Sequence, residues 1–192
     1  MKGGGQNNRK NPPVGSLMNT SEIVQCGVRE QHELSVLADR ISKVVTGHDS
    51  TIPDLRAGGK SEIKQSVSVI NSIRARVGME IKLLEKYQSE IKTLLSAIED
   101  KMEFLHDCSD PWLLETARER AEKLALSRTV YTQLSATVDA AIGQYSEYAE
   151  TLKEAVHGMS LMLEQSGAIE LTEIYLNVRK AAVRASEVKI SV

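Results

Sequence analysis

The chain has 192 residues, of which 41% are hydrophobic, 26% are charged and 4% are aromatic, and its formal net charge is −2. This balance excludes a wholly disordered chain, and a nearly neutral protein carries no strong field to attract nucleic acid. One Phe and one Trp are few for a thick globular core. A thin helical bundle, whose seams need mainly aliphatic and Ala side chains, fits this composition better.

Residues 1–19 are rich in Gly, Asn and Pro, and their charged side chains are all basic: Lys2, Arg9 and Lys10. Such a stretch buries too little to order itself, so we expect a disordered basic tail. It is either a solvated leader or an arm that binds an acidic polymer or a neighbouring subunit. We therefore count these three residues among the candidate partner-binding residues.

Several signals of secretion and membrane attachment are missing from the sequence. The first residues lack the apolar stretch of a secretory signal, and Lys2 stands where myristoylation requires Gly. We find no apolar run of 18 residues, so we expect no membrane-spanning helix and no membrane partner. Cys26 and Cys108 lie far apart without metal-ligand spacing, which favours two reduced thiols. We expect a soluble protein of the cytoplasm.

Four helices of unequal length are predicted along the chain. Asn19, Thr20 and Ser21 can cap the first, Gly47 can end it, and a loop from His48 to Lys60 follows. Asp110 suits an N-cap and Pro111 the first helical position. The apolar spacing slips by one residue at Gly167, which favours a break there. The predicted ranges are about 20–46, 61–106, 111–166 and 168–189.

The two longest predicted helices carry apolar residues at alternating spacings of 3 and 4. A repeat of 3.5 residues keeps one narrow stripe facing a partner helix. Because only a short segment joins them, these helices should form an antiparallel hairpin. The predicted fold of residues 20–192 is all-α: an elongated antiparallel helical hairpin or coiled coil with two shorter flanking helices. The stripes are Ile63, Val67, Ile70, Arg74, Val77, Ile81, Leu84, Gln88, Ile91, Leu95, Ile98, Met102, Leu105 and Leu114, Ala117, Ala121, Leu124, Arg128, Tyr131, Ser135, Val138, Ile142, Tyr145, Ala149, Leu152, Val156, Met159, Leu163.

Four polar residues interrupt the stripes, and such residues can fix the register of a coiled coil. They are Arg74, Gln88, Arg128 and Ser135. With the hairpin turning near residue 109, the Arg128 guanidinium should approach Gln88 or Glu85.

Residues able to do chemistry do not converge on one place. His106, Asp107 and Cys108 are consecutive, so on a helix their side chains diverge and a polar helix end is the simpler interpretation. Gly58, Gly59 and Lys60 lack the earlier Gly and the buried strand of a phosphate-binding loop. We therefore expect no enzyme, no catalytic residue, no metal site and no cofactor.

Two aromatic residues add candidate partner contacts. Trp112, directly after Pro111, is either a plug at the apex of the hairpin or an exposed binding hot spot. Tyr148 lies off the heptad stripe, so its side chain is a candidate for contact with another chain.

The stretch from Leu95 to Leu105, followed by a short break and by Ala117-Arg118-Glu119-Arg120, resembles the tektins. Tektins are filamentous coiled-coil proteins of axonemal microtubules, in which comparable helix–break–helix joints recur. The resemblance implies a structural coiled-coil protein of the cytoskeleton of a cilium or flagellum, with tubulin as a partner.

Two functional hypotheses follow for a chain of this kind. The first is a non-enzymatic structural protein of a cytoskeletal filament, with an axonemal microtubule as the candidate. The alternative is a helical subunit of a soluble adaptor or tethering complex, of vesicle traffic or of the kinetochore. Both imply other helical proteins as partners and self-association or hetero-oligomers, through apolar patches expected near 138–148 and 171–188.

Overall fold

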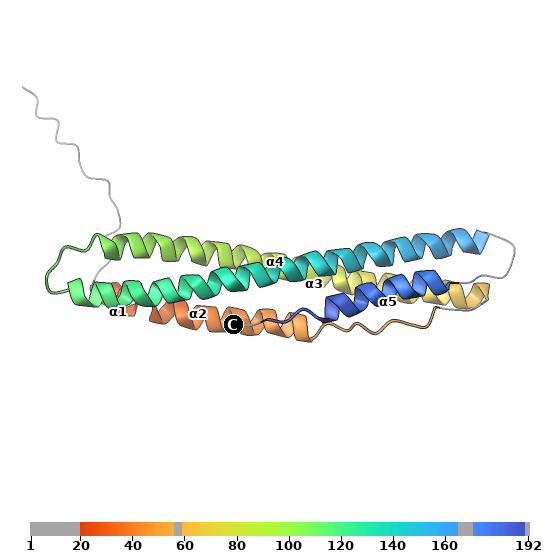
Figure 1. Ribbon diagram of the computed structural model, residues 1–192, viewed down its shortest axis with the longest axis horizontal. Helices are drawn as coiled ribbons and strands as arrows, with labels where there is room; N and C mark the ends of the chain where they lie inside the picture. Colours follow the sequence, from red (N-terminus) through yellow and green to blue (C-terminus); the bar gives the residue numbers. More distant parts are fainter. Residues whose placement is uncertain (1–19, 56–58, 165–170, 191–192) are drawn as a thin grey trace, which may run out of the picture.

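A computed structural model describes residues 20–55, 59–164 and 171–190. Within these residues the regular structure is helical throughout, which confirms the predicted all-α class (Figure 1). The predicted basic tail at 1–19 and the predicted break at Gly167 lie outside the described residues. None of the described helices has a stretch apolar and long enough to cross a membrane. The helices are α1 (Thr20–Gln25), α2 (Val28–Thr46), α3 (Lys60–His106), α4 (Leu114–Glu164) and α5 (Thr172–Ser186).

Helices α3 and α4 form the long antiparallel hairpin predicted from the heptad stripes (Figure 1). Leu84, Ile91 and Val138 of the stripes are fully buried in the seam, and other stripe residues such as Ile81 and Ile142 are partly buried beside them. The polar stripe residues Gln88 and Ser135 meet across the seam, where Gln88 Nε2 donates to Ser135 Oγ at 2.9 Å. This partly buried polar pair favours one register of the two helices, because a slip would break the hydrogen bond between them.

The predicted environment of Arg128 is wrong. Its guanidinium bonds to Glu99 Oε1 at 2.9 Å on the outside of the hairpin, instead of approaching Gln88 or Glu85. The turn extends to Leu113 and α4 begins at Leu114, so the pairing is displaced along both helices relative to a turn at residue 109. Arg74, the other basic stripe residue, is also exposed. Long cationic side chains leave the seam because their charged ends stay hydrated.

The first predicted helix is broken in two at Gly27. Gly27 has φ 81°, a left-handed conformation that side chains other than Gly avoid. A Cβ on this residue would also lie 2.8 Å from Cβ of Lys123 on α4. The break therefore lets the chain approach α4 closely, and α2 starts directly after it at Val28.

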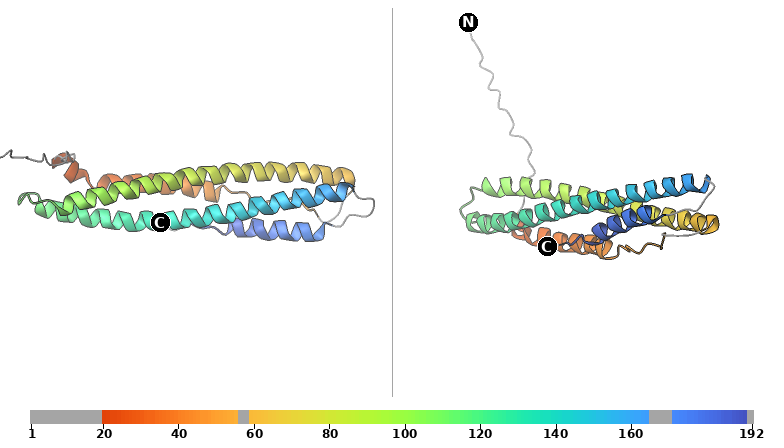
Figure 2. Two further views of the ribbon diagram at one scale, coloured as in Figure 1. Left: turned by 90° about the horizontal axis from the view of Figure 1, so that it is seen from above. Right: turned by 45° about the vertical axis from the view of Figure 1, so that its right-hand side comes forward.

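The shorter helices cover the hairpin in different places (Figure 2). Helix α2 contacts both α3 and α4, and α1 contacts α4 near the hairpin turn. Helix α5 folds back along α4, with Arg184 bonded to Glu147 and Ile174 beside Gly158. In the view from above, α2 lies beside α3 and α5 beside α4.

The segment from His48 to Leu55 has no regular structure, as the loop prediction requires, but it is packed against the core. Leu55 is 1% exposed, and the His48 side chain is buried between α3 and α4. As a result the expected exposed patch near 138–148 is not present, because Val138, Tyr145 and Tyr148 are fully buried.

Candidate functional site: the hairpin tip and the pocket behind it

The hairpin turn between α3 and α4 is closed by short local hydrogen bonds. The Asp110 carboxylate accepts from the Trp112 backbone N–H at 2.9 Å, and the Asp110 carbonyl accepts from the Leu113 N–H at 3.0 Å. The prediction of Asp110 as the N-cap and Pro111 as the first helical residue is wrong, because the helix begins at Leu114 and Asp110 instead bonds within the turn. These bonds hold the turn in one conformation.

Trp112 is 92% exposed at this turn. The interpretation of Trp112 as a plug is therefore wrong, while its alternative role as an exposed hot spot stays a prediction. Leu114, at the start of α4, is also exposed. A large indole left in water on an ordered turn is the kind of residue that anchors protein–protein contacts.

A hollow lined by both acidic and apolar side chains lies beside this turn. Its apolar lining includes Ile23 of α1 and Phe104 of α3, together with Leu113. The carboxylates in its lining are Asp100, Glu103, Asp107 and Asp110. A contact surface for a partner with both basic and apolar groups is the chemistry that this lining offers.

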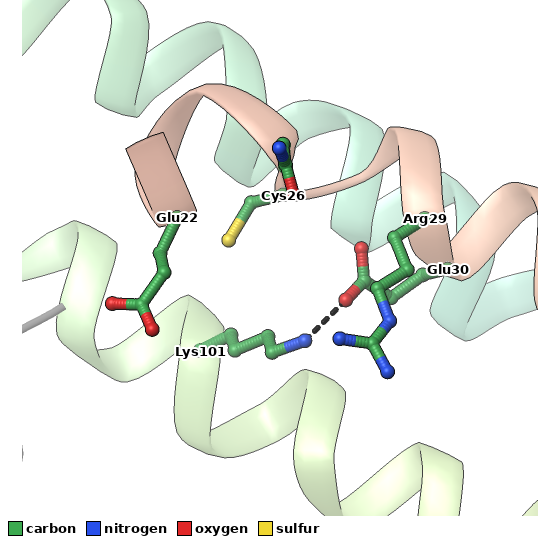
Figure 3. A pocket seen from close by; sticks show the side chains of 6 residues that line it. Glu22, Cys26, Arg29, Glu30 and Lys101 are labelled. Atoms are coloured by element: carbon green, nitrogen blue, oxygen red, sulfur yellow. Dashed lines mark hydrogen bonds and ion pairs between the residues drawn. The ribbon is translucent and has the colours of Figure 1, made fainter. Parts of the chain in front are cut away.

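A second, smaller pocket of about 160 Å³ lies where the break between α1 and α2 meets α3 (Figure 3). The side chains of Glu22, Cys26 and Lys101 converge on it, and a dashed line marks the ion pair between Lys101 and Glu30. Glu30 also accepts from the Gly27 backbone N–H at 2.6 Å, and its carbonyl accepts from the Tyr131 hydroxyl at 3.1 Å. One residue of α2 thereby joins the helix break, α3 and α4.

The electrostatics of this pocket argue for a structural role. Burial alone would raise the pKa of the Glu30 carboxyl, but the hydrogen bonds from Lys101 and from the Gly27 N–H bring this pKa below its ordinary value. Burial, reinforced by the Glu30 charge, raises the pKa of the Cys26 thiol. A protonated thiol is a poor nucleophile, so Cys26 is not activated for catalysis.

A third polar cluster surrounds His48, whose side chain is 1% exposed. Its Nδ1 lies 2.7 Å from Glu80 Oε2, and its ring stacks on Tyr145 with centroids 4.5 Å apart. Tyr148 approaches the same ring edge-on, with centroids 6.0 Å apart. Burial raises the pKa of Tyr148 to about 12. Because Tyr148 is fully buried, it is corrected from a surface contact to a core residue.

An open groove is lined by residues of α2 and α3. Val36 and Leu37 of α2 and Leu94 of α3 give it an apolar floor. Its charged lining residues are Glu33, Arg40, Lys86 and Glu90, two acids and two bases. This groove, which we call the α2–α3 groove, can accept another amphipathic helix.

The structure does not gather the predicted partner-binding residues into one site. Trp112 lies at the tip and Tyr148 in the core, while Lys2, Arg9 and Lys10 lie outside the described residues. Sequence reasoning missed the roles of Glu30 and His48, although Glu30 stands three residues after Gly27, the spacing of a capping glutamate. Within the described residues no group of three or more His, Cys, Asp or Glu side chains could hold a metal ion.

Comparisons of this chain with models of protein families, with curated proteins and with solved structures give no match. The resemblance to the tektins therefore stays a prediction.

Proposed function

We propose that this protein is a non-enzymatic structural protein, a helical rod that joins a cytoskeletal filament, with an axonemal microtubule as the assembly. The observation that carries the proposal is the exposure of Trp112 on an ordered turn at the end of a long hairpin. Helices α3 and α4 have 47 and 51 residues, which is about 70 and 77 Å at 1.5 Å per residue. A rod of this length places Trp112, at the hairpin turn, far from the opposite end of the molecule.

The ties across the rod support a mechanical role. The Gln88–Ser135 pair fixes α3 against α4, and Glu30 fixes α2 against both. Polar ties of this kind specify one alignment of helices, whereas an apolar seam alone tolerates slips. A protein that spaces or joins other components needs such a fixed alignment.

The proposal includes two contacts between this protein and the filament assembly. The basic residues Lys2, Arg9 and Lys10 suit the acidic surface of tubulin, with contacts screened over about 8–10 Å at ordinary ionic strength. The acidic hollow beside Trp112 suits a neighbouring protein that offers basic and apolar groups. The contact with tubulin and the contact with the neighbouring protein can be tested separately.

Co-sedimentation of the full chain with polymerised tubulin tests the first contact. We expect binding that falls with added salt and falls again when Lys2, Arg9 and Lys10 are all changed to Ala. A matched control changes the exposed basic residues Lys64, Lys92 and Lys153 to Ala, which leaves the net charge change the same. No binding by the unmodified chain at low salt would contradict the microtubule assignment.

The Trp112→Ala variant tests the tip. We expect its free energy of unfolding to stay within about 0.5 kcal/mol of the parent, because the indole is exposed. We expect affinity for the assembly partner recovered with the filament to drop about tenfold or more, as for an interface hot spot. Leu176→Ala, which removes a 53% exposed side chain from α5, is the control. If Trp112→Ala and Leu176→Ala lowered the affinity equally, the hairpin tip would not be the contact surface.

The α2–α3 groove favours a second candidate, a subunit of a helical adaptor or tethering complex. Its apolar residues, bordered by both basic and acidic side chains, fit an amphipathic helix that carries charges of both signs beside its apolar stripe. Val36→Glu would place an acid on the floor and should abolish capture of such a helix. Stoichiometric helical partners that depend on Val36, together with no binding to microtubules, would favour this candidate over the first.

A further inference from the structure

The hollow beside the hairpin turn, which we call the tip hollow, carries negative charge with little counter-charge. Its volume is about 550 Å³, and pockets of about 300–1,000 Å³ are the size that holds ligands in proteins. Four carboxylates line it, and none of its lining residues is basic. The carboxylates of Asp100 and Glu103 have neither a hydrogen bond nor an ion pair among the described residues. Asp107 has only a 3.7 Å approach to the exposed ring of His106.

The stability of α3 does not explain these acids. Asp100 and Glu103 lie in the last two turns of the helix, where the helix dipole disfavours negative charge. Glu99, the residue before Asp100, bonds to Arg128 at 2.9 Å, so an acid on this part of α3 pairs where a base is near. The acids that face the tip hollow have no such base. They are suited to a basic occupant that the described residues do not supply.

Residues 1–19 carry the chemistry that the tip hollow lacks. All of their charged side chains are basic, and apolar side chains follow the bases toward α1. The carboxylates of the hollow suit the bases, and its apolar lining of Ile23, Phe104 and Leu113 suits the apolar side chains. The bases are Lys2, Arg9 and Lys10, and the apolar residues are Val14, Leu17 and Met18.

The same segment is attached at the edge of the hollow. It joins the described chain at Thr20, the first residue of α1, and Ile23 of this helix lines the hollow. Lys10 precedes Thr20 by ten residues, and an extended chain of this length reaches up to about 35 Å. Such a short connection gives an effective concentration on the order of 1 mM, so even a contact with a dissociation constant of about 1 mM is half occupied. Contacts that are both ionic and apolar raise the occupancy further.

We propose that residues 2–18 dock in the tip hollow of their own chain, with their bases on its carboxylates and their apolar side chains over its apolar lining. The docked segment covers the hollow in the free protein. An acidic partner competes with the hollow for the bases, so its binding uncovers the hollow for a second protein. This coupling deepens the proposed function and rests on it, whereas the docking is a property of the isolated chain.

Cys108 reports the docked segment, because it lines the hollow and is partly exposed. The rate at which N-ethylmaleimide, an uncharged reagent, modifies Cys108 is measured in the full chain with Cys26→Ala. We expect this rate to rise at least about threefold when Lys2, Arg9 and Lys10 are all changed to Glu, and to rise in the parent with added salt. Removal of bases alone would disfavour the reactive thiolate and slow the reaction, so a faster reaction reports an uncovered hollow.

An exchange of charges tests the pairing itself. A variant with Asp100, Glu103 and Asp107 changed to Lys, combined with the three Glu substitutions in the segment, should react within about twofold of the parent rate. Lysines added beside a thiol would by themselves speed the reaction, so a slow reaction reports a docked segment. Asp110 is kept, because it bonds within the turn. A control with three exposed bases changed to Glu should keep the parent rate. Its positions are Lys64, Lys92 and Lys153.

Carbodiimide cross-linking of the isolated protein identifies the occupant. The reagent joins an amine to a carboxylate that it touches, and Lys101 with Glu30 is the positive control. We expect Lys2 or Lys10 joined to a carboxylate of the tip hollow in a product of monomer mass. Neither measurement contains tubulin or another protein, so the docking can fail while the proposed function stands. Cross-links of the segment only between two chains would make a second copy the occupant and overturn the proposal. A Cys108 rate that ignores both salt and the charges of the segment would overturn it as well.

Discussion

Helices α2 and α5 lie along the same hairpin but are held to it in different ways. Helix α2 buries Leu34, Leu37, Ile41 and Val45 and is tied to both long helices through Glu30. Helix α5 buries smaller side chains, and its Arg184–Glu147 ion pair is exposed. The difference indicates that polar bonds fix the register of α2 on the hairpin. Helix α5 packs against α4 mainly through small side chains, which bury less apolar surface than those of α2. The buried residues of α5 are Val178, Ala181, Ala182 and Ala185.

The largest effect is expected from Glu30→Ala. This change removes the partner of Lys101 and leaves the Gly27 N–H unpaired at the helix break. We expect a loss of about 2–3 kcal/mol in the free energy of unfolding by urea, because buried groups that lose a charged partner pay their full desolvation. Glu33→Ala, which removes an exposed partner of Arg29, should cost no more than about 0.5 kcal/mol. Similar losses in the two variants would mean that α2 is not anchored by Glu30.

Glu30 also makes the stability of the folded protein depend on pH. The folded pKa of Glu30 is lowered, so its contribution is fully present above its unfolded pKa and is lost as the pH falls through the folded value. The parent should therefore lose more stability on acidification below about pH 4.5 than the Glu30→Ala variant does. Urea unfolding of both proteins across this range measures the difference.

Gly27→Ala is expected to cause the next largest loss of stability. The substitution forces a side chain into the left-handed region at φ 81° and against Cβ of Lys123 at 2.8 Å. We expect a loss of about 2 kcal/mol, because strain and steric overlap act together. Gly78→Ala on α3, with open space at its Cβ position, should instead stabilise the protein by up to about 1 kcal/mol. A neutral Gly27→Ala would show that the break does not need its glycine.

The break at Gly27 also shows where sequence reasoning stops. The spacing of Ile63 to Leu105 predicted α3 almost to the residue, because a heptad stripe is a local property of one helix. The break between α1 and α2 has a local signal in Gly27 and Glu30, but the close contact with Lys123 on α4 is a tertiary feature that the local pattern does not encode. The same limit applies to Arg128, whose partner depended on the length of the turn.

Two tyrosines on α4 give a smaller and opposite pair of effects. The Tyr131 hydroxyl donates to the Glu30 carbonyl, whereas the buried Tyr148 hydroxyl has no hydrogen-bond partner among the described residues. Tyr131→Phe should cost about 1 kcal/mol, because it removes a buried hydrogen bond between α4 and α2. Tyr148→Phe should be neutral or stabilise by up to about 1 kcal/mol, because it removes an unpaired group. Thermal unfolding followed by circular dichroism ranks the two variants.

The candidate site was predictable only in part for a related reason. Its position directly after Pro111 placed Trp112 at the turn, but whether its indole is covered depends on the surrounding chain. Tyr148 lies off the α3–α4 stripe and was expected at the surface, yet His48 from a segment without regular structure covers it. Burial by a third element cannot be deduced from the pattern of two helices.

The smallest effect is expected from Arg184→Ala on α5. The ion pair with Glu147 is half exposed on both sides, so its loss should cost no more than about 0.5 kcal/mol. The variant should nevertheless change local opening, because it weakens an element attached mainly through small side chains. Native-state hydrogen exchange should show the α5 amides at 172–186 opening at lower free energy than the α2 amides at 28–46, already in the parent. Arg184→Ala should widen this gap without moving α2, and equal protection of the two helices would contradict the distinction drawn between them.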